Sequence, residues 1–343
     1  SYGSGSLIGG TGYGAGKITI NGGKFDLSVP YKSSWPSNLN ACGAAIGDGN
    51  RSNKKGTVEI EINDGEIKGS TAVQAAVIGT GHYSTITATV TVNGGKLDLK
   101  SISGTGDTTI GGSCIGTGDQ GVALGRVTIN GGEIIATTES GAAAIGGGAG
   151  TEGCTVVING GTVTATSNTT DVPAIGKGIY ISSGSDGALV VNGGSLKANS
   201  LPFSTIQNED YDDVHKTLVY APNVKSIVVD GKDYKVTANH PEDENLHLWM
   251  TEGKHDVIAT TADGTKNYEV EVTSTGEYLA KEYYTVQYAL TGITADGEAK
   301  AYAGESYKAT LTAEEGKRLP ESISVVMGDA AVDNAYDAAA GTI

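Results

Sequence analysis

Acidic residues in glycine-rich loops are the groups of this chain best suited to hydrolysis. They lie near recurring Ile-Gly pairs, at Asp48, Asp107, Asp119 and Glu152. Glycosidases need two carboxyl groups about 5 to 9.5 Å apart, and acids in successive repeats of one fold can approach one another. Acids in such loops also serve as solvated or turn-forming groups, so the sequence leaves a catalytic carboxyl pair open.

Other chemistry finds less support in the sequence. The five histidines are scattered without metal-ligand spacing, and no Ser/His/Asp arrangement is legible. Because no two cysteines form a CxxC pair, we interpret Cys42, Cys114 and Cys154 as small buried hydrophobes. The acidic run at 209–213 lacks the spacing of a calcium loop and is typical of a solvated linker. We therefore predict no catalytic residue set, no metal centre and no cofactor.

Aromatic side chains give a clearer indication of ligand binding. An insertion at residues 29–37 lengthens the first repeat and carries the only tryptophan of residues 1–205. Rings of this kind pair an apolar body with a polar edge, which suits a sugar face. The candidate ligand-binding residues are Tyr13, Tyr31, Trp35, His82 and Tyr83. The alternative is that Trp35 folds back over the first repeat.

Composition and charge narrow the class of protein. Glycine accounts for 53 of 343 residues and aromatic residues for 6%, a profile typical of a turn-rich all-β chain. The net charge of -16 is concentrated at residues 209–343, which hold 25 acidic and 11 basic residues. Because such a chain repels phosphate groups and has no apolar run of about 18 residues, we predict no nucleic-acid partner and no insertion into a membrane.

The elements that must position these residues come from an internal repeat. Each unit has a small residue before Ile-Gly, a loop, a β-rich segment ending in Asn-Gly-Gly or Asn-Asp-Gly, and a short alternating strand. The repeated isoleucines are Ile8, Ile46, Ile78, Ile115, Ile145 and Ile175. The repeated asparagines are Asn21, Asn63, Asn93, Asn130, Asn159 and Asn192. Three short strands per unit can form a core only by stacking, which predicts a right-handed parallel β-helix of about six coils at residues 1–205.

Aligned repeats also predict the register of the stack. One position of the third strand is always apolar and should point inward: Phe25, Ile67, Leu97, Ile134, Val163 and Leu196. The residues before it alternate in charge through the first four repeats: Lys24, Glu66, Lys96 and Glu133. Strands of adjacent coils lie about 4.8 Å apart, so opposite charges there attract one another. We also expect a pair between Lys17 and Glu59 and a hydrogen-bonded asparagine ladder.

The residues before the repeated isoleucines are mostly small. If the isoleucines point inward, these neighbours should point outward as an apolar stripe: Leu7, Ala45, Val77, Cys114, Ala144 and Ala174. Such a stripe rarely stays bare. It would then be a docking face, or a loop or neighbouring chain would cover it.

The sequence beyond residue 205 departs from the repeat. Hairpin signals around Asp230-Gly231 and Asp263-Gly264 predict a small β-sandwich at residues 206–276. This unit would cap the last coil, whose strand edges and apolar core would otherwise be exposed. We expect residues 277–343 to form a further module that is cut before its final strand, in a chain that is an excised fragment.

The AAIG and INGG phrases are similar to glycine-rich solenoids in large surface proteins of Gram-positive bacteria. Residues 1–205 as a whole resemble the pectate-lyase-like class of parallel β-helices. Enzymes of that class place Asp, Glu, Arg or Lys together on strand surfaces of neighbouring coils. The equivalent positions here hold Ala, Val, Cys, Thr or charges paired in ladders, which favours a protein without catalytic activity.

From Tyr284 onward the sequence resembles a repeated Ig-like module of bacterial cell-surface proteins, in which such modules act as stalk segments. This resemblance implies a secreted, extracellular protein at the cell surface. We therefore expect a non-catalytic region that binds a glycan or a host-surface ligand, as in an adhesin. The alternatives are a β-helix glycoside hydrolase or polysaccharide lyase, and a structural spacer.

Overall fold

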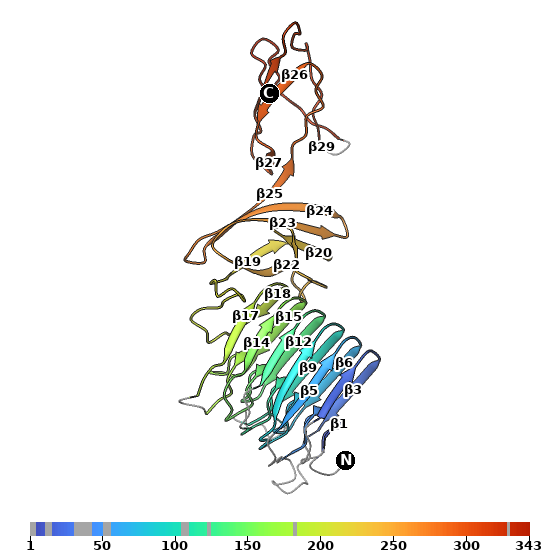
Figure 1. Cartoon of the computed structure of the whole chain (residues 1–343), viewed down its shortest axis with the longest axis vertical. Helices are drawn as coiled ribbons and strands as arrows, with labels where there is room; N and C mark the ends of the chain where they lie inside the picture. Colours follow the sequence, from blue (N-terminus) through green and yellow to red (C-terminus); the bar gives the residue numbers. More distant parts are fainter. Residues whose placement is uncertain are drawn as a thin grey trace.

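The computed structural model describes residues 5–10, 16–30, 43–50, 56–103, 110–121, 125–180, 184–327 and 330–343. The regular elements in these ranges are strands, and the ranges contain no helix that could span a membrane. A parallel β-helix is followed by antiparallel sheets, which confirms the predicted all-β fold class. Figure 1 shows these parts stacked end to end along the long axis of the molecule.

Three six-stranded parallel sheets build the β-helix. Sheet A contains the Ile-Gly strands β1 (Ile8–Gly9), β4 (Ile46–Gly47), β7 (Ile78–Gly79), β10 (Ile115–Gly116), β13 (Ile145–Gly146) and β16 (Ile175–Gly176). Sheet B contains β2 (Gly16–Ile20), β5 (Thr57–Ile62), β8 (Thr87–Val92), β11 (Arg126–Ile129), β14 (Thr155–Ile158) and β17 (Ala188–Val191). Sheet C contains β3 (Lys24–Val29), β6 (Glu66–Thr71), β9 (Lys96–Ile102), β12 (Glu133–Glu139), β15 (Thr162–Ser167) and β18 (Ser195–Ala198). Successive strands from sheets A, B and C make one coil, so β1, β2 and β3 form the first coil.

The coils stack in the register that the sequence predicts. The inward apolar position of sheet C is paired from coil to coil, beginning at Phe25 and ending at Leu196. In β8, Ala88, Val90 and Val92 are buried and the threonines between them are half-buried. This alternation follows from the period of two in a strand and fills the interior with branched side chains.

The predicted charge ladder lies along the outside of sheet C. Lys24, Glu66, Lys96 and Glu133 occupy one paired position on successive coils. Lys24 Nζ lies 2.9 Å from Glu66 Oε2, and Lys96 Nζ lies 2.9 Å from Glu133 Oε1. Both pairs are exposed enough that each contributes roughly 0 to 1 kcal/mol to stability. Their main effect is therefore on register.

The predicted contact between Lys17 and Glu59 is not the one that forms. The two residues are paired in register, but Lys17 Nζ lies 3.0 Å from Glu61 Oε2. Glu61 lies two residues further along the same strand and therefore on the same face. The long lysine side chain reaches this diagonal neighbour.

An asparagine ladder runs along the turns between sheets B and C. Asn63, Asn93, Asn130, Asn159 and Asn192 each donate through Nδ2 to Oδ1 of the asparagine one coil before, at 2.7 to 2.8 Å. Each interior amide thus donates one bond and accepts another. The prediction of this ladder is confirmed.

The expected outward stripe beside the isoleucines is wrong. Leu7 is 44% exposed, but the other five residues are buried in the core beside the isoleucines: Ala45, Val77, Cys114, Ala144 and Ala174. Each Ile-Gly strand is only two residues long and lies in a tight loop. In one such loop the Ala76 N–H donates to the Thr80 carbonyl at 3.0 Å. Because the chain turns sharply on both sides of the strand, sheet A has no regular outward face.

Two antiparallel sheets follow the β-helix. Sheet D pairs β19 (His215–Tyr220) with β22 (Asn245–Met250). Sheet E contains β21 (Lys232–Asp233), β20 (Val224–Val229), β23 (Gly253–Thr261), β24 (Gly264–Val272), β25 (Tyr278–Thr285) and β27 (Lys300–Tyr302), in that order. The two predicted hairpins are the pairs β20–β21 and β23–β24. Sheets D and E share one apolar core, so they form two packed layers.

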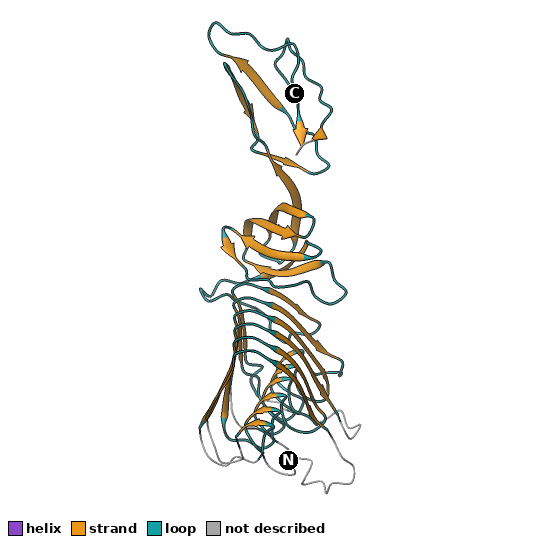
Figure 2. Cartoon of the chain, turned by 90° about the vertical axis from the view of Figure 1, so that its right-hand side faces the viewer, coloured by secondary structure: helices purple, strands orange, loops and turns teal. Residues whose placement is uncertain are grey.

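The layered unit covers the last coil of the β-helix (Figures 1 and 2). Trp249 is 9% exposed and belongs to the core of the β-helix, and its Nε1 donates to the Leu196 carbonyl at 3.1 Å. The ring of His240 bridges the hydroxyls of Thr164 and Ser195 at 2.8 and 2.7 Å. Burial lowers the pKa of His240 to about 3, so the ring that bridges the two units is neutral at pH 7. The predicted cap is present, and we call residues 206–276 the cap.

Sheet E continues beyond the cap. β25 lies beyond the domain boundary expected at residue 276, but it pairs with β24 of the cap on one side and with β27 on the other, so sheet E extends across that boundary. The remaining pairs are β26 (Ile293–Gly297) with β28 (Ala309–Ala313) and β29 (Val326–Met327) with β30 (Ala330–Ala331). Figure 2 shows this part at the far end of the molecule from the β-helix.

Breaking the asparagine ladder should destabilise the protein. Asn130→Ala removes one amide and leaves Asn93 Oδ1 and Asn159 Nδ2 without their partners. We expect the free energy of unfolding in urea to fall by about 1 to 3 kcal/mol. Asn21→Ala, at the ladder's end, is the matched control and should cost less because one ladder bond is lost. Equal losses for the two variants would contradict a cooperative ladder.

The cap should depend on Trp249. Trp249→Ala removes a large buried ring and should lower the free energy of unfolding by about 3 to 5 kcal/mol. Trp249→Phe keeps an aromatic ring but loses the hydrogen bond to Leu196, with an expected cost of about 1 kcal/mol. Leu279→Ala, 54% exposed on β25, serves as control. Chemical unfolding followed by circular dichroism measures all three, and an effect of Trp249→Ala as small as the control's would exclude this anchor.

Candidate functional site

Two of the four candidate catalytic acids are buried. Asp48 is fully buried, and the Ser84 hydroxyl donates to its Oδ2 at 2.7 Å. Asp119 is 2% exposed, and Gln74 Nε2 donates to its Oδ2 at 2.8 Å. Both carboxyls thus lie inside the loops that follow sheet A, where a polysaccharide does not reach them. Glu152 is half-buried, and Asp107 lies outside the described residues.

Burial also sets the protonation of these acids. Burial raises the pKa of Asp48, although the hydrogen bond from Ser84 acts in the opposite direction. Burial raises the pKa of Asp119 to about 7, although the hydrogen bond from Gln74 acts in the opposite direction. A carboxyl with such a pKa can act as a general acid if a substrate contacts it. Here its burial makes a structural role in the loop the better interpretation.

His82 and Tyr83, which are neighbours in the sequence, are the two predicted binding residues that the structure describes. His82 is 4% exposed, and its Nε2 lies 4.0 Å from Asp119 Oδ2. Tyr83, with a φ of 53° and 43% of its surface exposed, has its ring centroid 4.0 Å from that of His82. Only Tyr83 of the two offers a ring to solvent. The other three predicted binding residues, Tyr13, Tyr31 and Trp35, lie outside the described residues.

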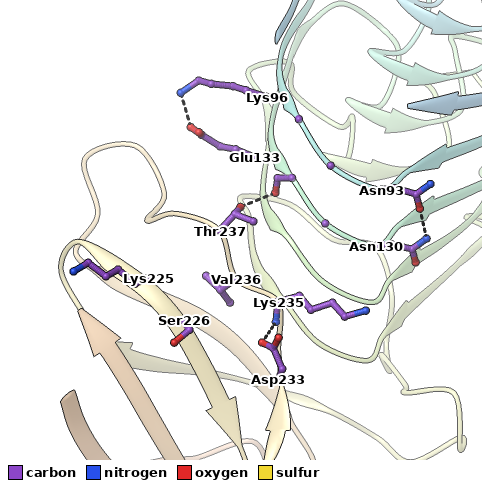
Figure 3. A pocket seen from close by; sticks show the side chains of 14 residues that line it. Asn93, Lys96, Asn130, Glu133, Lys225, Ser226, Asp233, Lys235, Val236 and Thr237 are labelled. Carbon is purple, nitrogen blue, oxygen red and sulfur yellow. Dashed lines mark hydrogen bonds and ion pairs between the residues drawn. The ribbon is translucent and has the colours of Figure 1, made fainter. Parts of the chain in front are cut away.

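A groove lies where the cap overhangs the turns of the β-helix (Figure 3). It has a volume of about 500 Å³. One wall is formed by the turns and strand starts at residues 93–96 and 130–133, in the third and fourth coils. The other wall comes from the cap: Lys225, Ser226, Asp233, Lys235, Val236 and Thr237. We call this space the cap groove.

Hydrogen bonds hold the cap wall in place. The Thr237 hydroxyl donates to the Gly132 carbonyl at 2.9 Å, and the Gly161 N–H donates to the Lys235 carbonyl at 2.9 Å. Asp233 Oδ1 accepts from the Lys235 N–H at 2.8 Å and closes the loop after β21. The cap groove is therefore preformed, as is usual for ligand sites.

The charge in the cap groove differs from that of the chain. Three lysines, Lys96, Lys225 and Lys235, face two acids, Glu133 and Asp233, which gives a formal charge of +1 in a chain of net charge -16. Lys96 is paired with Glu133. Within the described ranges, Lys225 and Lys235 make no ion pair, and both are exposed. The groove thus presents two lysines to a ligand.

Sequence patterns alone did not identify the cap groove. Its walls come from segments about a hundred positions apart, and Thr237 and Gly132 are separated by 105 residues. Each wall alone has a structural explanation, because the turns carry the asparagine ladder and the cap wall flanks a hairpin. The one available signal was that Lys225, Lys232 and Lys235 cluster around the Asp230-Gly231 turn in the acidic part of the chain.

The raised pKa of Asp119 predicts a pH dependence of stability. A carboxyl whose pKa is about 7 when folded and about 3.9 when unfolded favours folding in its protonated form. Its contribution is fully present below pH 4 and is lost as the pH rises through 7. The free energy of unfolding of Asp119→Asn, minus that of the unaltered chain, should therefore increase between pH 4 and pH 8. Urea unfolding at each pH measures it, with Glu152→Gln as control, and a constant difference would contradict the raised pKa.

Comparison of the chain with protein-family models, with curated proteins and with solved structures finds no match in any of the three. The resemblance to pectate-lyase-like solenoids and to Ig-like surface modules thus rests on the sequence patterns themselves.

Proposed function

We propose that this chain is a non-catalytic, glycan-binding region of an extracellular bacterial surface protein, as in an adhesin, and that the cap groove binds the glycan. The observation that carries this proposal is the preformed groove of about 500 Å³ between the cap and the turns. It is open along the turns of two coils, so a chain-like ligand can lie in it.

The lining of the cap groove favours a sugar over a peptide. Its side chains are amides, hydroxyls, lysines and acids, and Val236, which is buried, is the one apolar side chain that lines it. A peptide ligand commonly relies on apolar pockets for its side chains. A glycan instead offers many hydroxyls, which suit the Asn93 and Asn130 amides, Ser226 and the glycine backbone of the turns.

The positions of the acidic side chains also fit a binding protein better than an enzyme. Asp48 and Asp119 lie inside their loops, and Glu133, in the cap groove, is engaged by Lys96. Two carboxyls that flank a glycosidic bond must both reach the substrate. The acids of the described residues do not offer such an arrangement in the cap groove, so we place the glycoside hydrolase or polysaccharide lyase alternative behind binding.

A second candidate function, a structural spacer, is favoured by the shape of the molecule. The β-helix, the cap and the last antiparallel sheets follow one another along one axis (Figures 1 and 2). Such an arrangement separates its two ends. A spacer needs no ligand, so binding measurements distinguish it from the glycan-binding proposal.

A glycan array with the whole chain tests the proposed function. Ser226→Trp places an indole in the cap groove, and we expect at least a tenfold loss of affinity for any glycan that binds there, by steric exclusion. Ile258→Trp is the matched control, because Ile258 lies on β23, is 38% exposed and does not line the groove. Trp35→Ala tests the aromatic insertion in the same assay.

The outcomes separate the candidate functions. Loss of binding in Ser226→Trp alone supports the cap groove. Loss in Trp35→Ala alone would move the site to the insertion. Binding to no glycan would favour the spacer, and release of shortened sugars from any glycan would favour the enzyme.

A further inference from the structure

We infer that the cap groove takes an acidic glycan, whose anionic oxygens accept hydrogen bonds from the Gly95 and Gly132 N–H groups and pair with Lys225 and Lys235. This inference rests on the proposed function and adds the chemical class of the ligand. One backbone donor recurs in the second to sixth coils and has different partners in different coils.

The donor is the N–H of the last glycine in each turn between sheets B and C. In the third to sixth coils these glycines are Gly95, Gly132, Gly161 and Gly194, with φ values of 87°, 90°, 86° and 77°. Such angles favour glycine. Because the four turns share one conformation and stack in register, their N–H groups point to the same side of the β-helix.

The cap itself occupies two of these donors. The Gly161 N–H donates to the Lys235 carbonyl at 2.9 Å, and the Gly194 N–H donates to the Tyr234 carbonyl at 2.7 Å. Consecutive carbonyl oxygens of one chain thus satisfy donors on consecutive coils. The fifth and sixth coils therefore show which partner this row of donors takes: acceptor oxygens on an extended chain.

In the second coil, the glycine N–H donates to a side chain of the same turn. Its turn reads Asn63-Asp64-Gly65, and Asp64 Oδ1 accepts from the Gly65 N–H at 2.8 Å. This is the one turn in which an acid replaces the first glycine. A carboxylate is thus already a partner of this type of donor within the chain.

The third and fourth coils have the donors but no acceptor. Among the residues that the structure describes, none accepts a hydrogen bond from the Gly95 or Gly132 N–H. Both glycines line the cap groove, where Gly95 is half-buried and Gly132 is buried. The two donors lie one coil apart, about 4.8 Å, and the cap chain turns away from them after Thr237. A ligand with regularly spaced acceptor oxygens would extend the row that the cap begins.

The charge of the groove selects among such ligands. Lys225 and Lys235 line the cap side of the groove and make no ion pair in the described part of the chain. Backbone N–H groups together with lysines bind anionic oxygens more strongly than hydroxyls, because hydrogen bonds to a charged group are stronger. A neutral sugar would leave both cations unused, so a glycan bearing carboxylates or sulfates fits the groove best.

Binding of charged and neutral forms of one glycan tests this inference with the whole chain. Hyaluronan decasaccharide carries carboxylates, chondroitin sulfate also carries sulfates, and carboxyl-reduced hyaluronan is neutral. By calorimetry, we expect at least one acidic chain to bind on the order of tenfold more tightly than the neutral form, with affinity falling as salt rises. Comparison of the two acidic chains distinguishes carboxylate from sulfate.

Variants of the lysines test the charge. Lys225→Gln with Lys235→Gln should weaken binding of the acidic chain on the order of tenfold and leave the neutral chain unchanged. Lys216→Gln with Lys232→Gln is the matched control. It removes the same charge from exposed lysines of the cap that do not line the cap groove.

Variants of the turn test the backbone donor. Gly131→Asn should place an acceptor on the Gly132 N–H, as Asp64 does for Gly65, without adding charge, and should weaken binding several-fold. Gly131→Ala has the same Cβ, 2.6 Å from the Asn93 carbonyl oxygen before relaxation, but no acceptor. It therefore controls for any shift of the turn, and thermal unfolding of both variants checks that they fold alike.

Each result supports or overturns the inference. Tighter binding of an acidic chain, weakened by the lysine pair and by Gly131→Asn but not by their controls, supports it. Equal binding of acidic and neutral chains, lost in Ser226→Trp, would overturn it and leave the proposed function intact. Binding that Ser226→Trp does not change would reject both.

Discussion

In-register stacking of the turns between sheets B and C is the constraint on which the rest of this structure depends. The asparagine ladder joins successive coils at 2.7 to 2.8 Å through amides that each donate and accept. If the register between two coils shifted by one residue, every inward side chain of the adjoining strand would point outward. The ladder therefore fixes at once which side chains fill the core and which charges face one another on sheet C.

At the end of the β-helix the last strands have no further coil to pair with. The cap covers this end with Trp249, which packs in the core, and with a neutral His240 that is hydrogen-bonded to Thr164 and Ser195. Its wall from Tyr234 to Thr237 continues along the turns and bonds to three of them. This overhang creates the cap groove, so one device closes the fold and forms the candidate site.

The positions of the acidic and basic side chains favour a binding function over a catalytic one. Acids that the loop sequences offer for hydrolysis, Asp48 and Asp119, are inside the protein, where burial raises the pKa of each. Two lysines without ion partners in the described ranges face the groove instead. Buried acids stabilise loops at a cost that depends on pH, whereas exposed cations beside preformed backbone donors suit recognition of a charged ligand.

The sequence by itself determined the coils, because a strict repeat leaves little choice of register. The spacing of Asn-Gly-Gly and the alternation Lys24, Glu66, Lys96, Glu133 predicted the β-helix, its inward stack and both ladders. Hairpin signals at Asp230-Gly231 and Asp263-Gly264 predicted two pairs of the cap. Such features depend on local conformation and on contacts between equivalent positions, which a repeat displays directly.

Only the tertiary structure decided the rest. It buried Ala45 and its equivalents, since a two-residue strand in a tight loop has no outward face. It also assembled the cap groove from segments that the sequence keeps far apart, since which turns the cap covers depends on how the two units pack.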